Sequence, residues 1–337
     1  MRSIANRSRS PFALLGVIAL VASACGGPGA TTAPSVAASP TAAATSGGAA
    51  SPTAGATSGG AVDLTGASFT VGSKEFTEQL ILGQITIQVL EAAGATVTDE
   101  TGLIGSAVVR EALTGDEIDM YWEYTGTGWI NHLGNTAPVV GTEEQFIAVR
   151  DADEANGIVW LEPAPLNNTY AIAVASETAT SMEVTTLSDL AANADGATLC
   201  AASEFLGRDD GLPGLEAAYG FEFSDVATLE LGLIPDQIDS GENCVFGEVF
   251  ATDSRIADLD LLVLEDDLSF FAVYEPSLNV RQEVFDANPG LAELFAPIAA
   301  ALDTVTMQAL NSRVDQGGEN EADVAADFLA EMGLIDE

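Results

Sequence analysis

Lys74 is the only lysine in the chain, and it stands in the segment VGSKEFTEQ, where an apolar strand is expected to end and a helix to begin. In parallel α/β sheets, ligands gather at the carboxyl ends of the strands. The N-terminus of a helix at that place adds a partial positive charge that favours an anion. Lys74 is therefore a candidate anion-binding residue, and the alternative is an ordinary surface lysine without a role in binding.

Four aromatic residues form a second pattern, because each stands near an expected strand end or where the chain turns back: Tyr124, Tyr170, Phe250 and Tyr274. A quaternary ammonium ion has no N–H to donate, so its natural receptor is a set of ring faces. Each desolvated ring contributes about 1–2 kcal/mol through cation–π attraction. The alternative interpretation is that these rings only cap the core.

Sequence motifs of common enzyme classes are absent. The chain has no GxxxxGKS or GxxxxGKT phosphate loop, no GxSxG nucleophile turn and no GxGxxG after a strand. His132 is the only histidine, which argues against histidine-based triads and multi-histidine metal sites. Neighbouring acids such as Asp209 and Asp210 are interpreted as solvated surface, since 51 acidic residues produce such pairs by chance. We expect no enzymatic activity, no cofactor and no metal.

Alternating strands and helices predict an α/β fold. Strands are expected at 68–73, 95–99 and 118–122, with helical spacing of apolar residues between them. A second series begins with TYAIAVAS around Tyr170 and ends with a strand at 245–250, and after Tyr274 the chain turns helical. Such alternation indicates βαβ units and parallel sheets. We expect two lobes, 67–169 with 275–337 and 170–274, joined by two crossovers.

Composition narrows the function classes. A chain of 337 residues indicates about two domains plus tails. It carries 51 acidic and 10 basic residues, a formal net charge of −41. Nucleic-acid binding requires clustered Lys and Arg, so it is excluded as a function. We interpret the acidity as solubility or adaptation to salt.

The N-terminus has the features of a secretion signal. Three arginines, Arg2, Arg7 and Arg9, precede an apolar stretch at 12–22 that is too short to span a bilayer, which takes roughly 20 residues. The stretch ends in ASAC, which resembles a bacterial lipobox with Ala in place of the usual Leu. We therefore expect a signal peptide over 1–24 and a lipid on Cys25. The alternative is ordinary cleavage after ASA, which leaves a soluble protein.

A low-complexity segment follows. Residues 26–62 contain no charge, and ASPTAAATSGGA at 38–49 is repeated at 50–61 with one change. Such a sequence cannot bury a core, so we expect a flexible tether over 25–66 between the lipid and the folded part. Lipidation of Cys25 leaves Cys200 and Cys244, which we expect to form a disulfide. The alternative is two small buried residues that never meet.

Several segments together resemble a known family. GSKEFTEQLILGQ, EYTGTGW, NNTYAIAV, EFLGRDDG and FATDSRI are similar to segments of glycine betaine/choline/proline betaine-binding proteins of osmoprotectant ABC transporters, and the resemblance covers about 68–337. It implies a two-lobed periplasmic-binding-protein fold, of the Venus-flytrap type, with the ligand in the cleft. It also implies an extracytoplasmic monomer that delivers its ligand to a permease in the membrane.

The resemblance also assigns roles to individual residues. The aromatic cage falls on Tyr124, Tyr170, Tyr274 and Phe250, where the family usually has tyrosine at the last position. The carboxylate-binding groups fall on Lys74, Thr127 and Arg208, and Asn168 matches a polar position near the ligand. With Lys74 and Arg208 both present, the resemblance favours a zwitterion such as glycine betaine over choline.

Three alternatives stay open. The same fold could bind choline, carnitine or ectoine instead of glycine betaine. The chain could be an extracytoplasmic enzyme, which the missing nucleophile and base disfavour. It could also be an acidic adhesin that binds the cell wall.

Overall fold

The computed structural model describes residues 62–194 and 196–335. The predicted signal peptide, Cys25 and the predicted tether as far as residue 61 lie outside the described residues. Leu64 is buried in the core, so the folded part begins a few residues before the predicted end of the tether at 66.

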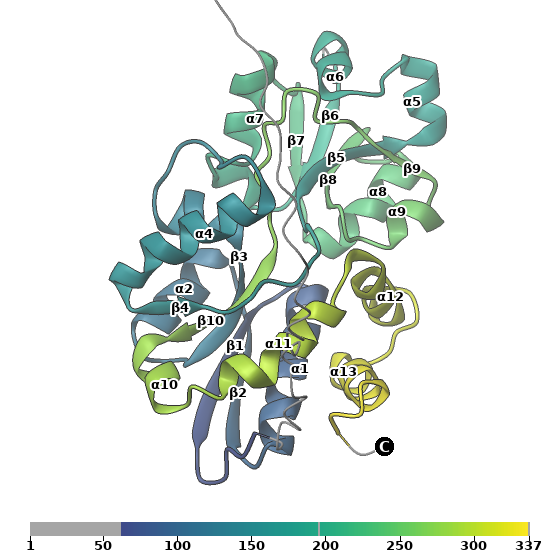
Figure 1. The fold of residues 1–337 in the computed structure, drawn as a ribbon. Helices are drawn as coiled ribbons and strands as arrows, with labels where there is room; N and C mark the ends of the chain where they lie inside the picture. The colour runs from purple at the N-terminus through teal and green to yellow at the C-terminus, as the bar shows by residue number, and fades with distance from the viewer. Residues whose placement is uncertain (1–61, 195, 336–337) are drawn as a thin grey trace, which may run out of the picture. The chain divides into compact units, whose positions relative to one another are not determined.

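The first sheet has the strand order β2-β1-β3-β10-β4. Its strands are β1 (Ser68–Lys74), β2 (Thr96–Leu103), β3 (Met120–Tyr124), β4 (Ile158–Trp160) and β10 (Pro276–Arg281). β1 runs parallel to β2 and β3, whereas β10 runs antiparallel to β3 and β4 (Figure 1). The sheet is therefore mixed, and one of its strands comes from the far end of the chain.

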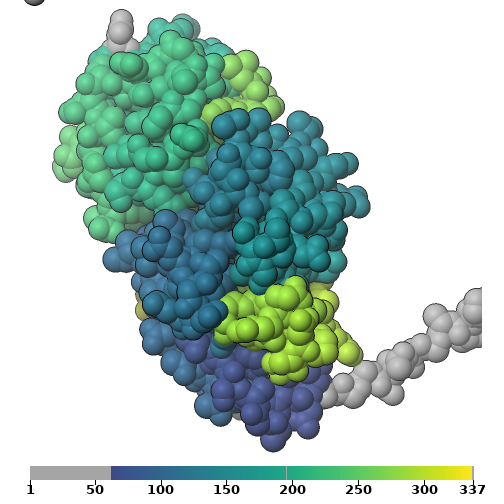
Figure 2. Space-filling view, turned by 90° about the vertical axis from the view of Figure 1, so that its left-hand side faces the viewer, coloured from purple at the N-terminus to yellow at the C-terminus, as the bar shows by residue number. Residues whose placement is uncertain are grey.

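Ten helical segments accompany this sheet: α1 (Thr77–Ala92), α2 (Ser106–Thr114), α3 (Thr125–Thr127), η1 (Gly128–His132), α4 (Thr142–Asp153), η2 (Glu154–Asn156), α10 (Gln282–Ala287), α11 (Leu291–Ala301), α12 (Thr304–Asp315) and α13 (Glu321–Glu331). α1 contacts both α12 and α13. In the space-filling view, the yellow-green segment around α10 lies against purple and blue residues from the beginning of the fold (Figure 2).

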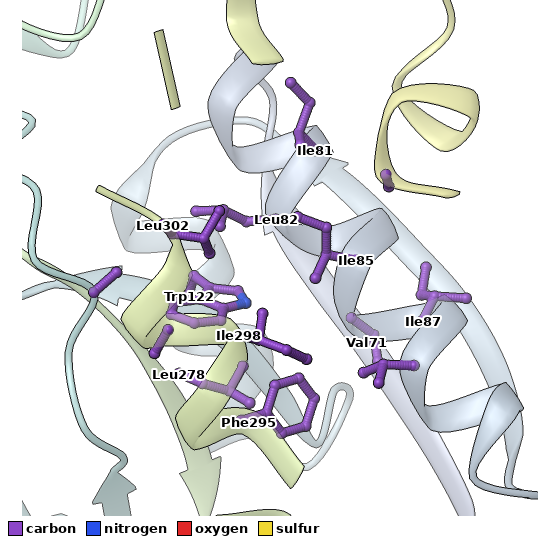
Figure 3. Packing of buried hydrophobic residues seen from close by; sticks show 14 of the residues in the cluster. Val71, Ile81, Leu82, Ile85, Ile87, Trp122, Leu278, Phe295, Ile298 and Leu302 are labelled. Carbon is purple, nitrogen blue, oxygen red and sulfur yellow. The ribbon is translucent and has the colours of Figure 1, made fainter. Parts of the chain in front are cut away.

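The core of this part lies between the sheet and its helices. Leu82 and Ile85 of α1 point to the side on which Trp122 of β3 and Phe295 of α11 lie (Figure 3), and Ile81 belongs to the same buried cluster. All five are at most 1% exposed, and burial of each such side chain contributes about 1.5–3 kcal/mol. This packing holds the carboxyl ends of β1 and β3 in place.

The second sheet has the order β7-β6-β8-β5-β9. Its strands are β5 (Tyr170–Ala175), β6 (Thr198–Ala201), β7 (Asp225–Thr228), β8 (Phe246–Phe250) and β9 (Leu261–Val263). Its helical segments are α5 (Ser176–Met182), α6 (Leu187–Asn193), η3 (Phe205–Gly207), α7 (Leu212–Tyr219), η4 (Leu231–Leu233), α8 (Ile234–Ser240) and α9 (Arg255–Asp258). A disulfide joins Cys200 of β6 to Cys244, just before β8.

Each sheet with its helices is one lobe, called the first and the second lobe below. The chain passes from the first to the second between β4 and β5, and returns between β9 and β10. The predicted two-lobed α/β fold is confirmed, and both sheets are mixed because each also contains antiparallel pairs. The lobe boundaries that we propose, 169/170 and 274/275, fall in these connections. Within the described part of the chain, no helix combines the length and the apolar character needed to cross a membrane.

Candidate functional site

A cavity of about 720 Å³ is lined by residues from both lobes. The eight residues predicted to contact a ligand all line it: Lys74, Tyr124, Thr127, Asn168, Tyr170, Arg208, Phe250 and Tyr274. Lys74 ends β1 and Tyr124 ends β3, and these parallel strands finish at the same edge of the first sheet. Tyr170 and Phe250 are paired across β5 and β8 of the second sheet. The topology thus brings together residues up to 200 positions apart in the chain.

Five rings form a continuous group, called the aromatic set: Phe76, Tyr124, Tyr170, Phe250 and Tyr274. Phe76 stacks on Tyr124 with centroids 6.3 Å apart and lies 5.2 Å from Phe250. Tyr170 lies 5.1 Å from Phe250 and 5.8 Å from Tyr274, the latter edge-on. All five rings line the cavity.

Phe76 is a member of this set that the sequence analysis missed. It occupies the N-cap position of α1, two residues after Lys74, and has no capping hydrogen bond from its side chain. The sequence contained a reason to consider Phe76 a site residue, because it stands in the same strand-to-helix segment that made Lys74 a candidate.

Two of the rings already contact cations of the protein. The Lys74 Nζ lies 5.0 Å from the centre of the Tyr124 ring, and the Arg208 Cζ lies 5.2 Å from that of Tyr170. Both distances are within the roughly 6 Å range of cation–π attraction. The rings of this cavity therefore have faces that accept a positive charge.

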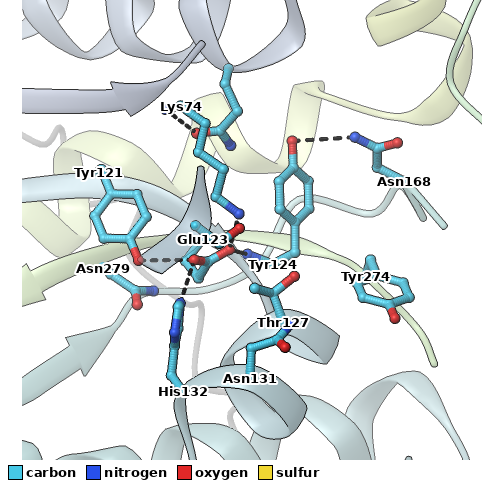
Figure 4. A network of polar contacts seen from close by, with 12 residues as sticks. Lys74, Tyr121, Glu123, Tyr124, Thr127, Asn131, His132, Asn168, Tyr274 and Asn279 are labelled. Atoms are coloured by element: carbon cyan, nitrogen blue, oxygen red, sulfur yellow. Dashed lines mark hydrogen bonds and ion pairs between the residues drawn. The ribbon is translucent and has the colours of Figure 1, made fainter. Parts of the chain in front are cut away.

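Lys74 is paired with a buried carboxylate (Figure 4). Its Nζ lies 2.7 Å from Oε1 of Glu123, whose Oε2 accepts a hydrogen bond from the Tyr121 hydroxyl and lies 2.7 Å from Nε2 of His132. Burial opposes ionisation of Glu123, but the charge of Lys74 and the contact with His132 outweigh it and lower the pKa of Glu123. The carboxylate stays charged and holds the ammonium in place.

Arg208 also forms ion pairs with neighbouring acidic side chains. Its guanidinium donates to both oxygens of Asp210 at 2.7 and 2.6 Å and to Oε1 of Glu204 at 2.7 Å. It reaches Oγ1 of Thr127 in the first lobe at 3.3 Å. Burial raises the pKa of Asp210, but the hydrogen bonds from Arg208 outweigh this and lower it. The sequence analysis missed this pairing, because it treated Asp210 as solvated surface whereas the residue is 3% exposed.

Asn168 belongs to a buried polar network between the lobes. Its Nδ2 donates to Oε1 of Glu78 at 2.8 Å, and the same oxygen accepts from the Tyr124 hydroxyl at 2.8 Å. The Thr252 hydroxyl, which follows β8, donates to Oδ1 of Asn168 at 3.0 Å. Burial raises the pKa of Glu78. Asn168 and Glu78 therefore fix the orientation of the Tyr124 ring.

A second pair of contacts joins the lobes at the rim of the cavity. Glu204 accepts hydrogen bonds from the Ser106 hydroxyl at 2.6 Å and from the Ser106 N–H at 3.2 Å, at the N-terminus of α2. An anion at a helix N-terminus is favourable. Together with the bond from Arg208 to Thr127, this contact holds the two sides of the cavity together in the structure.

Comparison with known proteins identifies the family. The family model described as the substrate binding domain of ABC-type glycine betaine transport systems matches residues 67–331. A glycine-betaine-binding protein of Pseudomonas aeruginosa is 40% identical over 79% of this chain and 88% of its own length. The glycine betaine-binding protein YehZ of Escherichia coli is 36% identical over 78% of this chain and 90% of its own.

Solved structures agree with this comparison. Apo YehZ from E. coli superposes with a TM-score of 0.59 at 33% identity and covers 80% of this chain and 99% of that one. A structure described as a glycine betaine/carnitine/choline ABC transporter superposes with a TM-score of 0.65 at 27% identity, over 79% of this chain and 99% of the other. This chain therefore belongs to the family of substrate-binding domains of ABC-type glycine betaine transport systems.

Proposed function

We propose that this protein captures a small quaternary-ammonium osmolyte, glycine betaine or a similar betaine, in the cavity between its lobes and delivers it to an ABC permease in the membrane. The observation that carries the proposal is that the aromatic set and two cations, Lys74 and Arg208, line one cavity. A betaine has the matching halves, a methylated cation and a carboxylate. The family of the chain and the names of its relatives support the same ligand class.

The aromatic set would hold the ammonium end. Burial raises the pKa of Tyr124, Tyr170 and Tyr274 well above the ordinary value, so these phenols stay neutral at physiological pH. A neutral ring presents its negative face to a cation without the cost of a buried charge. Phe250 supplies such a face without a hydroxyl, and so does Phe76.

The carboxylate end would meet Arg208, Thr127 and Lys74. Because Asp210 and Glu204 already occupy the guanidinium, a ligand carboxylate would replace one charge-assisted hydrogen bond by another. Such an exchange yields less affinity than binding to an unpaired cation would. The ring faces would then supply the larger part of the binding free energy.

Lobe closure would couple binding to delivery. The ligand would touch Lys74 and Tyr124 in the first lobe and Tyr170 and Arg208 in the second, so it would favour the arrangement in which both sides are close. The contacts of Glu204 with Ser106 and of Arg208 with Thr127 would be made in the same arrangement. The permease would recognise this form.

We also propose that the protein is an extracytoplasmic monomer anchored through a lipid on Cys25.

Calorimetric titration of the purified protein with a ligand panel tests the proposal. We expect saturable single-site binding of glycine betaine. The affinities for choline, carnitine and ectoine are measured in the same way and compared with it. Dimethylglycine, which has one methyl group fewer and carries an N–H when protonated, is the matched control and should bind more weakly. Absence of binding to every quaternary amine, with the protein folded by circular dichroism, would refute the proposed function.

A further inference from the structure

Glu248 is a buried acid of the cavity that the proposed function does not use. It lies in β8, two residues before Phe250. Side chains two residues apart in a strand leave the same face of a sheet, and both residues line the cavity. Glu248 is 1% exposed. A carboxyl group therefore stands beside a member of the aromatic set.

The contacts of Glu248 differ from those of the acids beside Lys74 and Arg208, and Glu248 is buried, unlike Glu75 and Glu230, which also line the cavity. Glu123, Glu204 and Asp210 each form an ion pair with Lys74 or Arg208. Glu248 forms no ion pair among the described residues, and its hydrogen bond there is the one that Oε2 accepts from the N–H of Ala202 at 2.7 Å. Its Oε1 has no hydrogen-bond partner among them, so that oxygen is available to a ligand.

The surroundings of Glu248 favour its neutral form. Burial raises its pKa to about 8; the backbone N–H of Ala202 opposes the rise, the negative charge of Glu204 adds to it, and Arg208 opposes it. Tyr170 stays neutral, because burial raises its pKa well above the ordinary value and the charge of Glu248 would raise that pKa further. A neutral carboxyl group donates a hydrogen bond, whereas an ionised one only accepts.

We infer that Glu248 is a specificity-determining residue of the cavity, and that its charge decides between two kinds of quaternary ammonium ligand. An uncharged Glu248 admits a zwitterionic betaine and can donate a hydrogen bond to its carboxylate. A charged Glu248 repels that carboxylate and favours a cation that has none, such as choline. The inference rests on the proposed function, because it refines the ligand class of the same cavity.

Charge balance in the cavity makes this residue decisive. Lys74 and Arg208 are already matched by Glu123, Glu204 and Asp210, so they leave no excess positive charge for a ligand carboxylate. One further negative charge then acts with little compensation, and charges interact strongly where water is excluded. The exposed acids of the surface are screened and lack this influence.

Titration with glycine betaine and choline at pH 7 and pH 9 tests the inference. In the wild type, affinity for glycine betaine should fall about tenfold between these values, because the neutral fraction of a group with a pKa of about 8 falls by about that factor. Affinity for choline should rise several-fold over the same interval. In Glu248→Gln, which keeps the shape and cannot ionise, the ratio of affinities at the two pH values should be close to one for both ligands.

Glu222→Gln is the matched control, since it removes an exposed acid of the second lobe that does not line the cavity. In this variant, as in the wild type, affinity for glycine betaine should fall and affinity for choline should rise between pH 7 and pH 9. The same direction of change for both ligands in the wild type would overturn the inference, and that result needs no variant to fold. A folded Glu248→Gln protein with the wild-type responses would overturn it as well. Both results leave betaine binding intact, whereas loss of all binding at both pH values refutes the proposed function itself.

Discussion

Tyr170 contacts more of the site than any other ring of the aromatic set. Its ring lies 5.1 Å from those of Phe205 and Phe250 and 5.8 Å from that of Tyr274, and Arg208 covers one side of it. It therefore joins the ring faces to the cationic end of the cavity. At the scale of single residues, the affinity of the site should depend most strongly on this ring.

Tyr170→Ala should weaken binding of glycine betaine at least tenfold. A desolvated ring face contributes about 1–2 kcal/mol to binding of a cation, and about 1.4 kcal/mol corresponds to a factor of ten. Tyr170→Phe keeps the face and should stay within a few-fold of the wild type. Calorimetry on both variants checks this, and wild-type affinity in a folded Tyr170→Ala protein would contradict the role of the ring.

The sequence predicted residues that line the cavity, but not the acids that lie beside its cations. Lys74 and the four rings could be found because each stands near an expected strand end or turn, whereas Arg208 follows η3 and was named only through the family resemblance. The acids that neutralise the cations could not, because Glu123 and Asp210 are identified by what lies beside them in space. Glu248 is intermediate, since a charged residue two positions before Phe250 in an otherwise apolar strand was a readable signal.

At the scale of elements, the turn from β3 into α3 positions Tyr274. A Cβ on Gly126 would lie 2.7 Å from Cε1 of the Tyr274 ring and 2.8 Å from the carbonyl oxygen of Val273. Only glycine allows this approach. The turn thereby sets how far the ring extends into the cavity.

Gly126→Ala should reduce both affinity and stability. Overpacking of this kind costs about 1–3 kcal/mol, and the displaced ring should weaken binding several-fold. Gly207→Ala is the control, because a Cβ there meets no atom within 4 Å. Calorimetry measures the affinity of both variants, and circular dichroism measures their melting temperatures. Equal affinities and equal melting temperatures for Gly126→Ala and Gly207→Ala would contradict this role of Gly126.

The Cys200–Cys244 disulfide joins two elements of the second sheet. It connects β6 to the segment that enters β8, and these strands run parallel next to each other. The double variant Cys200→Ser and Cys244→Ser should lose about 2–4 kcal/mol of unfolding free energy, since the unfolded chain gains freedom. Urea denaturation measures the loss. A variant as stable as the wild type would show that the bond adds nothing to stability.

Elements with strong apolar patterns were predicted, and others were not. β1, β3, β5 and β8 agree with the expected segments. β10 was not predicted, because the chain after Tyr274 was expected to be helical. Residues 276–281 form a strand through pairing with β3 and β4, which lie far away in the chain and leave no local signal. Short segments such as η1 and η4 depend on local contacts that leave no periodic signal.

At the scale of the whole molecule, the net charge of −41 should make stability depend on salt. Like charges repel one another in the compact state, and salt screens them within about 10 Å at 0.1 M. We expect the melting temperature to rise between low salt and about 0.5 M NaCl. Calorimetric scans check this, with sucrose as an uncharged control, and a melting temperature that falls as NaCl is added would contradict it.

The two-lobed arrangement was predictable from the alternation of elements, and the family resemblance implied a cleft, but the contacts inside the cavity could not be predicted. Each lobe contributes one side of the site. The order of residues in the chain does not reveal how deep the cavity is or which residues lie side by side in it. Lys74 pairs with Glu123 within the first lobe, and Arg208 pairs with Glu204 and Asp210 within the second, so only the hydrogen bond from Arg208 to Thr127 depends on the meeting of the lobes. For this reason the sequence could suggest a ligand class, but it could not indicate how the binding free energy divides between the aromatic rings and the charged groups.

A crystal structure of the protein with glycine betaine tests the central claim most directly. We predict that the ammonium nitrogen lies within about 6 Å of the ring centres of Tyr170, Phe250 and Tyr274, with the carboxylate toward Arg208 and Thr127. A ligand bound outside this cavity, or with its carboxylate against the rings, would contradict the account.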